Sequence, residues 1–202
     1  EVPVYYVSMP RRDQSNITTV LREMSWSVNL NLGKTVPADL MADQFVHYLA
    51  DQASALNCPK ALLVVDETQR LAAGQLDAFA EVHDKLLLMD VELTTLFVAN
   101  DPECWPLIEK IQGKNYRHIH GRFFTQAIRF QGLSSAKEVI ACLKQYDRLQ
   151  PPDSWPTYTS YFLPKSVSQG WQFSSLGREL WRIFNEYQRD YKIPSWGMKY
   201  FT

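Results

Sequence analysis

The chain has 202 residues, 46% of them hydrophobic and 21% charged, with a net charge of −1. This balance is typical of a domain that buries a hydrophobic core, and it excludes disordered, collagen-like and disulfide-rich proteins. Because no apolar run approaches the roughly 20 residues of a membrane-spanning helix and the three cysteines form no C-x-x-C spacing, we expect a cytoplasmic protein with no membrane contact.

Strands and helices are predicted to alternate over the first half of the chain. Three apolar, β-branched runs predict strands: residues 2–8, 61–65 and 93–99. Helical spacing of apolar residues predicts four helices: residues 16–26, 38–56, 75–89 and 105–111. This order implies βαβ units and an α/β fold with a parallel sheet, in which the run at 61–65 is buried on both faces. Ligands are expected at the carboxyl ends of these strands.

A second unit, rich in aromatic residues, is predicted to follow a short strand at 128–130. Ser135-Ala-Lys-Glu138 matches a capping box and predicts a helix to about residue 146. A further helix is predicted over residues 176–191. We interpret this unit as a small helical subdomain with an aromatic core; the alternative is an aromatic surface that docks a partner.

Charge is segregated along the chain. Residues 36–109 contain thirteen Asp or Glu and three Lys or Arg, whereas residues 110–148 contain eight Lys or Arg and two Asp or Glu. Two interpretations stay open: two solvated surfaces of opposite sign, or a basic surface that contacts the phosphate of a nucleotide or a nucleic acid.

The strongest chemical signal is the acidic pair that ends the second predicted strand, in Ala61-Leu-Leu-Val-Val-Asp-Glu-Thr-Gln-Arg-Leu71. At the end of a buried strand, Asp66 can hold a magnesium-bound water and Glu67 can take a proton from an attacking water. This is the pattern of a Walker B motif, although any parallel strand can end in acidic residues. The sequence therefore predicts a site for ATP and Mg²⁺.

Two further residues support this prediction. Asn100 follows the third strand, where its amide can orient a water or contact a γ-phosphate. Arg122, in Ile119-His-Gly-Arg-Phe-Phe124, can stabilise transition-state charge on a nucleotide held by a neighbouring subunit. The alternative for Arg122 is an ordinary surface salt bridge.

Taken together, Val-Val-Asp66-Glu67, Ala-Asn100 and Gly-Arg122-Phe resemble the Walker B, sensor 1 and arginine-finger motifs of an AAA+ ATPase. More narrowly, Val4-Tyr-Tyr-Val-Ser-Met-Pro10 and Leu-Val-Val-Asp-Glu-Thr-Gln-Arg-Leu71 are similar to the transposition regulators of the TniB and TnsC type, which are related to the phage Mu B protein. The similarity covers about residues 2–148. It implies a P-loop-type (AAA+) α/β core over residues 1–130 and a helical lid over residues 131–202, in which Arg178 contacts phosphate as sensor 2.

The chain departs from this family at the phosphate loop. The candidate loop is Val28-Asn-Leu-Asn-Leu-Gly33-Lys34-Thr35, in which Val28 occupies the position of the first glycine and no strand precedes the motif. The first predicted strand resembles the family's second strand, which follows the phosphate loop. We therefore expect the loop to lie upstream of this numbering or to be absent, and we expect this chain alone to bind ATP weakly or not at all.

The resemblance also implies partners. Proteins of this type assemble as rings or filaments on duplex DNA and recruit transposase, so we expect sequence-tolerant, salt-dependent DNA binding, with Arg11, Arg12 and Lys34 as candidate backbone contacts. The expected function is an ATP-dependent regulator of DNA transposition. Two alternatives stay open: a replication-initiator-like AAA+ ATPase, and a non-catalytic adaptor that keeps the fold and binds protein partners.

Overall fold

The computed structural model describes residues 2–11, 16–30, 32–33, 35–150, 155–193 and 195–197. The chain divides into two compact units, Glu1–Ala127 and Ile128–Thr202. Sequence analysis placed the division at residue 130. All the strands of the sheet belong to the first unit, and the described secondary structure of the second is helical apart from one isolated bridge between Leu133 and Trp196.

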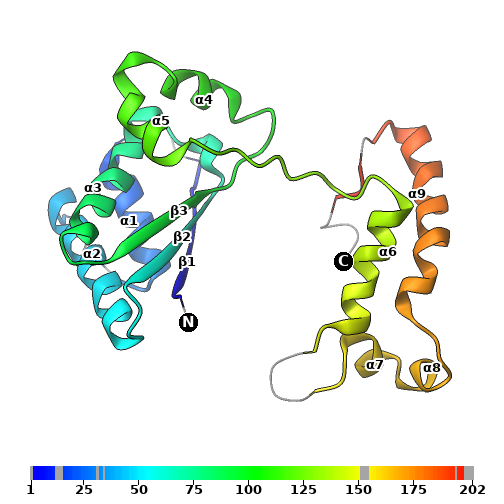
Figure 1. The fold of residues 1–202 in the computed structure, drawn as a ribbon. Coiled ribbons are helices and arrows are strands. Elements are labelled where there is room, and N and C mark those ends of the chain that lie inside the picture. The colour runs from blue at the N-terminus through cyan, green and yellow to red at the C-terminus, as the bar shows by residue number, and fades with distance from the viewer. Residues whose placement is uncertain are drawn as a thin grey trace. The chain divides into compact units, whose positions relative to one another are not determined.

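The N-terminal unit is an α/β fold built on a parallel sheet (Figure 1). Its strands lie in the order β1 (Val4–Ser8), β2 (Lys60–Asp66) and β3 (Glu92–Phe97). Its helices are α1 (Ile17–Ser27), α2 (Ala38–Ala55), α3 (Asp77–Leu87), α4 (Trp105–Ile111) and α5 (Arg117–Phe123). These bounds confirm the predicted α/β class with a parallel sheet, the three predicted strands of that sheet and the helices α1 to α4.

Local sequence explains where the first helices begin and end. The side chain of Asn16 accepts a hydrogen bond from the Thr19 backbone N–H at 3.0 Å and so caps the first turn of α1. Pro37 lies at the start of α2, where its missing N–H leaves no helix hydrogen bond unmade. Asn57 follows α2 with a φ of 49°, a left-handed conformation that asparagine adopts more readily than most residues, and the chain turns there toward β2.

Helices cover one face of the sheet. Successive side chains of a strand point to opposite faces, and the alternate β2 residues Ala61, Leu63 and Val65 are at most 2% exposed. They belong to the same core as the buried residues of α1, α2 and α3, which lie on one side of the strands in Figure 1. This core positions the carboxyl ends of the strands.

The opposite face of the sheet is accessible. The register aligns Tyr6 of β1, Val64 of β2 and Leu96 of β3 in one cross-strand row on this face. Tyr6 is 57% and Leu96 is 50% exposed, and Leu62 and Val64 of the central strand are only half-buried. The prediction that β2 is buried on both faces is therefore wrong, because its second set of alternate residues keeps access to solvent.

The segment after α4 differs from the prediction. Residues 117–123 form α5, which sequence analysis did not predict, and Ile119 on this helix is fully buried. The strand predicted at 128–130 does not form, and Ile128 and Phe130 are 91% and 80% exposed. A short apolar run becomes a strand only where a neighbouring strand accepts its hydrogen bonds, and β3 pairs only with β2 in the described part of the sheet.

The C-terminal unit consists of the helices α6 (Ala136–Arg148), α7 (Tyr158–Phe162), α8 (Pro164–Ser168) and α9 (Gly177–Tyr191). The predicted start of α6 is confirmed: the Ser135 hydroxyl accepts a hydrogen bond from the Glu138 N–H at 3.3 Å. The Glu138 carboxylate reaches back one residue further than a capping box requires and accepts from the Ser134 N–H at 2.7 Å. The helix predicted over residues 176–191 is confirmed as α9.

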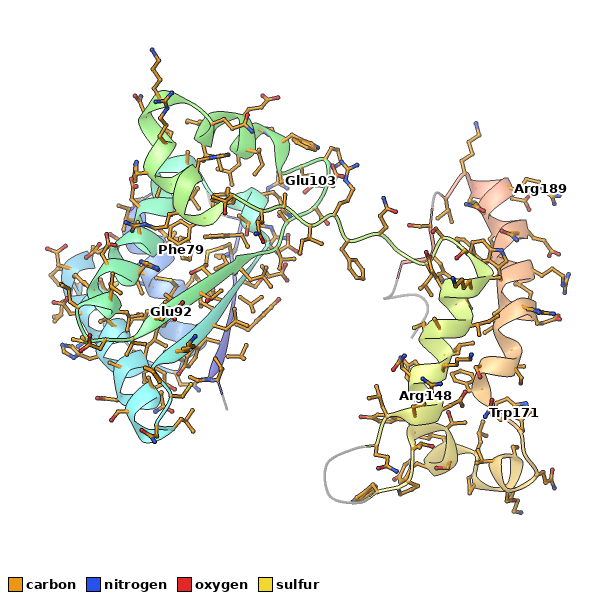
Figure 2. The ribbon with its side chains drawn as sticks, viewed as in Figure 1. Phe79, Glu92, Glu103, Arg148, Trp171 and Arg189 are labelled. Atoms are coloured by element: carbon orange, nitrogen blue, oxygen red, sulfur yellow. The ribbon has the colours of Figure 1, made fainter. Side chains whose placement is uncertain are left out.

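The two longest helices of this unit, α6 and α9, pack against each other (Figure 2). Val139 and Leu143 of α6 and Phe184 of α9 are buried, and the Phe184 ring stacks on Trp196 with 4.9 Å between ring centroids. Within the described ranges of both units, each helix is too short or too polar to cross a membrane.

Candidate functional site

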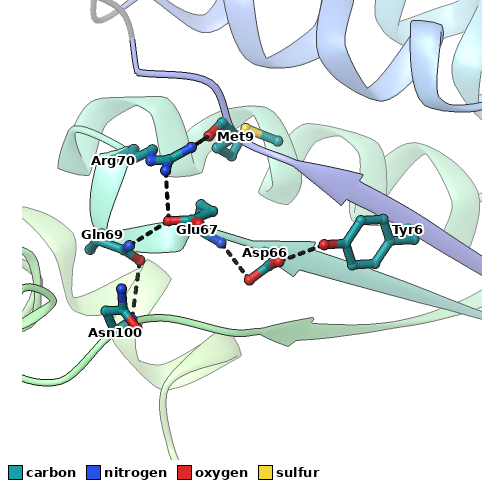
Figure 3. A network of polar contacts seen from close by, with 7 residues as sticks. All are labelled: Tyr6, Met9, Asp66, Glu67, Gln69, Arg70 and Asn100. Carbon is teal, nitrogen blue, oxygen red and sulfur yellow. Dashed lines mark hydrogen bonds and ion pairs between the residues drawn. The ribbon is translucent and has the colours of Figure 1, made fainter. Parts of the chain in front are cut away.

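The predicted acidic pair lies at the carboxyl edge of the sheet (Figure 3). Asp66 is the last residue of β2, and Glu67 follows it in the left-handed region with φ 59° and ψ 34°. This conformation costs a glutamate on the order of 1 kcal/mol because its Cβ crowds the following carbonyl. The chain then enters the single 3-10 turn Thr68–Arg70, so the Glu67 side chain stays at the edge of the sheet.

Asp66 accepts two hydrogen bonds. Its Oδ1 accepts from the Glu67 N–H at 2.8 Å, and its Oδ2 accepts from the hydroxyl of Tyr6 at 2.5 Å. The hydrogen bond to Asp66 raises the pKa of Tyr6 above its ordinary value of 10.0, and desolvation and the negative charge of the acidic pair act in the same direction. Each carboxylate oxygen has two lone pairs, so both oxygens of Asp66 keep an acceptor position for a further donor.

The carboxylate of Glu67 is held by its own turn. Its Oε2 accepts a hydrogen bond from Gln69 Nε2 at 2.7 Å and lies 3.1 Å from Arg70 Nη2. Arg70 also donates from Nη1 to the carbonyl of Met9 at 3.0 Å, which ties the segment after β1 to this edge. The side chains of Arg70 and Glu67 are 37% and 29% exposed, so their ion pair contributes at most about 1 kcal/mol.

Asn100 lies next to the acidic pair. The side-chain oxygen of Gln69 accepts a hydrogen bond from the Asn100 N–H at 3.2 Å, and the other end of the same amide contacts Glu67. Asn100 is exposed. The structure therefore brings the predicted residues Asp66, Glu67 and Asn100 together at one edge of the sheet.

Sequence analysis assigned no role to three residues that join this network. Gln69 and Arg70 stand in the motif directly after the acidic pair, and their position in a turn was the available signal. Tyr6 is 60 residues away from Asp66 in sequence, and nothing local connects the two. Only the parallel pairing of β1 with β2 brings the phenol to the carboxylate.

Arg122 lies on α5 and contacts α3. Its Nη1 is 2.8 Å from Asp84 Oδ1 and donates to the carbonyl of Ala80 at 3.3 Å. Among the described residues, these contacts form the surface salt bridge that sequence analysis left as the alternative. A role toward a nucleotide in a neighbouring subunit stays a prediction.

The other predicted residues lie on other segments of the chain or outside the described residues. Arg178 is an exposed residue in the first turn of α9, in the C-terminal unit. Arg11 is exposed in the segment after β1. Arg12 and Lys34 lie outside the described residues. Their predicted roles toward nucleotide phosphate and DNA stay predictions.

The carboxyl edge of the sheet suits a metal ion that is coordinated largely by a bound ligand and only in part by the protein. Within the described residues, no cluster of three or more His, Cys, Asp or Glu side chains forms a metal site. Magnesium is commonly held by one or two carboxylates together with water and substrate phosphates, and Asp66 has the free acceptor positions that this arrangement needs. These positions would suit a Mg²⁺ ion whose other ligands are water and phosphate oxygens.

Comparison with known proteins identifies no family for this chain. It matches no protein-family model and no curated protein sequence.

Proposed function

We propose that this chain carries the Walker B part of an ATP site, in an AAA+ ATPase that regulates DNA transposition. One observation supports the nucleotide role most directly: Asp66, Glu67 and Asn100 meet at the carboxyl edge of parallel strands, where the Gln69 side chain joins the Glu67 carboxylate to the Asn100 backbone N–H. Ligands of open parallel α/β sheets bind at this edge. The left-handed backbone conformation of Glu67 adds support, because energetically unfavourable backbone conformations are concentrated at functional sites.

Each residue has one task in this proposal. Asp66 would hold Mg²⁺ through a water, and the bound ion supplies charge neutralisation of the phosphates. Glu67 takes the proton of the attacking water, and Asn100 orients that water. Gln69 joins the Glu67 carboxylate to the backbone N–H of Asn100, so it ties the base to the segment that carries the orienting residue. Arg122 and Arg178 are the proposed contacts from a neighbouring subunit and from the lid.

The test measures ATP hydrolysis by the protein at its full natural length. Glu67→Gln keeps the shape and the Gln69 contact but removes the base, so we expect kcat to fall about 100-fold or more while ATP still binds. Asp66→Asn should weaken Mg²⁺-dependent ATP binding.

Glu92→Gln is the matched control, because this exposed carboxylate lies at the opposite end of the sheet, paired with Lys60. Hydrolysis that is absent, or that survives Glu67→Gln, refutes the nucleotide role.

The transposition role rests on the resemblance of the β1 and β2 segments to TniB- and TnsC-type regulators. It is tested by ATP-dependent assembly of the protein on duplex DNA, followed by sedimentation, and by retention of a transposase on the assembled complex. We expect rings or filaments that form with ATP and disperse with ADP. Assembly that is the same with ATP and with ADP would contradict this role.

A non-catalytic adaptor is the second candidate, and one observation favours it. Both carboxylates are already engaged within the chain, Asp66 by Tyr6 and Glu67 by Gln69 and Arg70. In an adaptor these contacts serve only to hold the edge of the sheet. Glu67→Gln would then alter stability without any effect on ATP binding or hydrolysis, which separates the two candidates in the same experiment.

A further inference from the structure

The C-terminal unit contains a basic groove, of whose lining the proposed ATP site uses only Arg178. Its volume is about 420 Å³. It is lined by small and apolar residues with three cations among them: Ala136, Lys137, Ile140, Ala141, Lys144 and Arg178. We call this feature the α6–α9 groove.

The sequence of α6 places its cations on one side. Lys137 and Lys144 are seven residues apart, which is two helical turns, and Arg148 follows Lys144 by one further turn. At about 1.5 Å per residue, the stripe from Lys137 to Arg148 is roughly 16 Å long. Figure 2 shows Arg148 at one end of α6.

Gly177 allows the third cation of the groove, Arg178, to lie close to this stripe of cations on α6. A Cβ on Gly177 would lie 2.4 Å from Ile140 Cγ1 and 3.1 Å from Ile140 Cα, so only glycine allows α9 to begin this close to α6. Arg178 is the next residue. The close approach of the two helices therefore sets Arg178 beside Lys137 and Lys144 in the lining of the groove.

The acidic side chains of α6 and α9 that are nearest in sequence to these cations make their contacts elsewhere, and Asp147 accepts hydrogen bonds from Thr159, Phe173 and Ser174. Glu138 accepts from Ser134, and Glu179 and Glu186 both pair with Arg182. In the described part of the chain, the side chains of Lys137, Lys144, Arg148 and Arg178 make no hydrogen bond or ion pair. Residues 128–202 as a whole contain ten Lys or Arg against six Asp or Glu. The lining of the groove therefore carries three cations and no acidic side chain.

We propose that the α6–α9 groove and Arg148 bind the phosphate backbone of duplex DNA. The three cations of α6 lie along one side of the helix and do not converge on one point, which suits a polyanion with a charge every ~1.7 Å of its axis. The small residues Ala136 and Ala141 leave room for the backbone between the lysines. Ile140 is the one large apolar side chain in the lining, so the groove lacks the apolar anchor that an acidic peptide or a membrane surface would use.

This proposal depends on the proposed function only for the choice of duplex DNA as the polyanion. It assigns DNA contact to the C-terminal unit, in addition to the candidates Arg11, Arg12 and Lys34 from the sequence. No base edge is read by these side chains, so binding should tolerate any sequence.

The test is fluorescence anisotropy of a labelled 20-base-pair duplex of arbitrary sequence, titrated with the full chain without nucleotide at several salt concentrations. We expect the wild-type chain to bind, and Lys137→Gln/Lys144→Gln/Arg178→Gln to bind about tenfold or more weakly. The logarithm of the binding constant falls linearly with the logarithm of the salt concentration, with a slope of about −0.9 for each phosphate contact. Removal of three contacts should therefore make this slope shallower by about 2–3. Since nucleotide is left out, failure of the ATPase proposal does not alter this result.

The matched control is Lys165→Gln/Arg189→Gln/Lys192→Gln, which removes the same charge from the same unit outside the groove and leaves Arg182 paired with Glu179 and Glu186. We expect it to bind the duplex as the wild type does within about threefold. Equal loss in both triple variants, or no binding by the wild type, overturns the proposal. So does tighter binding to phosphatidylserine vesicles or polyglutamate than to the duplex. Circular dichroism of each variant checks that α6 and α9 are intact.

Discussion

The phenol of Tyr6 on β1 donates a hydrogen bond of 2.5 Å to Asp66 Oδ2 on β2, across 60 residues of sequence. This contact raises the pKa of Tyr6 above 10.0, through the hydrogen bond first and then through desolvation and the nearby negative charge. A raised pKa means that the contact stabilises the folded state below about pH 10 and that its contribution is lost as the pH rises through the folded pKa.

We expect Asp66→Asn to return the Tyr6 pKa toward 10.0, because the carboxylate acceptor and its charge are removed. The measurement is the ¹³Cζ chemical shift of labelled tyrosine as a function of pH, with Tyr6→Phe to assign the resonance. An identical Tyr6 titration in the wild type and in Asp66→Asn would contradict the contact.

The backbone of Glu67 predicts an unusual order of stability between two variants. Glu67→Gly and Glu67→Ala lose the same contacts to Gln69 and Arg70, but only glycine adopts a φ of 59° without strain. We expect Glu67→Gly to be more stable than Glu67→Ala by about 1 kcal/mol in urea unfolding. At Glu92, which lies in the extended strand β3, the order should reverse. Alanine as the more stable variant at both positions would show that Glu67 is not left-handed in solution.

The two faces of the sheet should respond differently to truncation. Leu63 is fully buried against the helices, so Leu63→Ala should lower the free energy of unfolding by about 2–5 kcal/mol. Leu96 is 50% exposed on the other face, so Leu96→Ala should cost less than about 1 kcal/mol. Chemical denaturation of both variants checks this difference. A large cost at Leu96 would mean that a further layer covers this face in the natural protein.

Asp147 joins α6 to the turn that precedes α9. Its carboxylate accepts hydrogen bonds from the backbone N–H groups of Phe173 and Ser174 at 2.9 and 3.0 Å and from the Thr159 hydroxyl at 2.8 Å. Burial alone would raise the pKa of Asp147, but these hydrogen bonds together outweigh it and hold the pKa below the ordinary value of 3.8. The carboxylate therefore stabilises the folded unit above about pH 4, and this stabilisation is lost as the pH falls through the lower folded pKa.

We expect Asp147→Asn to destabilise the C-terminal unit by about 1–3 kcal/mol at neutral pH, with a difference from wild type that shrinks below about pH 4. Hydrogen exchange of the α6 and α9 amides measures this loss. Asp190→Asn is the control, because Asp190 makes an exposed pair with Arg189 and its loss should cost less than about 0.5 kcal/mol. Equal protection of α6 in wild type and Asp147→Asn at neutral pH would be evidence against this role.

The sequence by itself determined the succession of strands along the chain and the position of the acidic pair. Strand and helix periodicities are local, and the run Ala61–Val65 ends in two carboxylates whatever surrounds it. Once the strands are parallel, their carboxyl ends share one edge, so the presence of Asn100 and Glu67 at the same edge followed from the sequence and one topological rule. The capping residues of α1 and α6 are likewise local, since a cap bonds within its own first turn.

Only the tertiary structure decided which face of the sheet is covered, that residues 117–123 form a helix, and which distant groups meet. Burial depends on the elements that pack over a residue, so Leu63 and Leu96 look alike in sequence and differ in exposure by half of their surface. The Tyr6 contact to Asp66 and the approach of Arg178 to Lys137 join residues that no local pattern connects. They form because strand pairing and the glycine contact between α6 and α9 bring those backbones together.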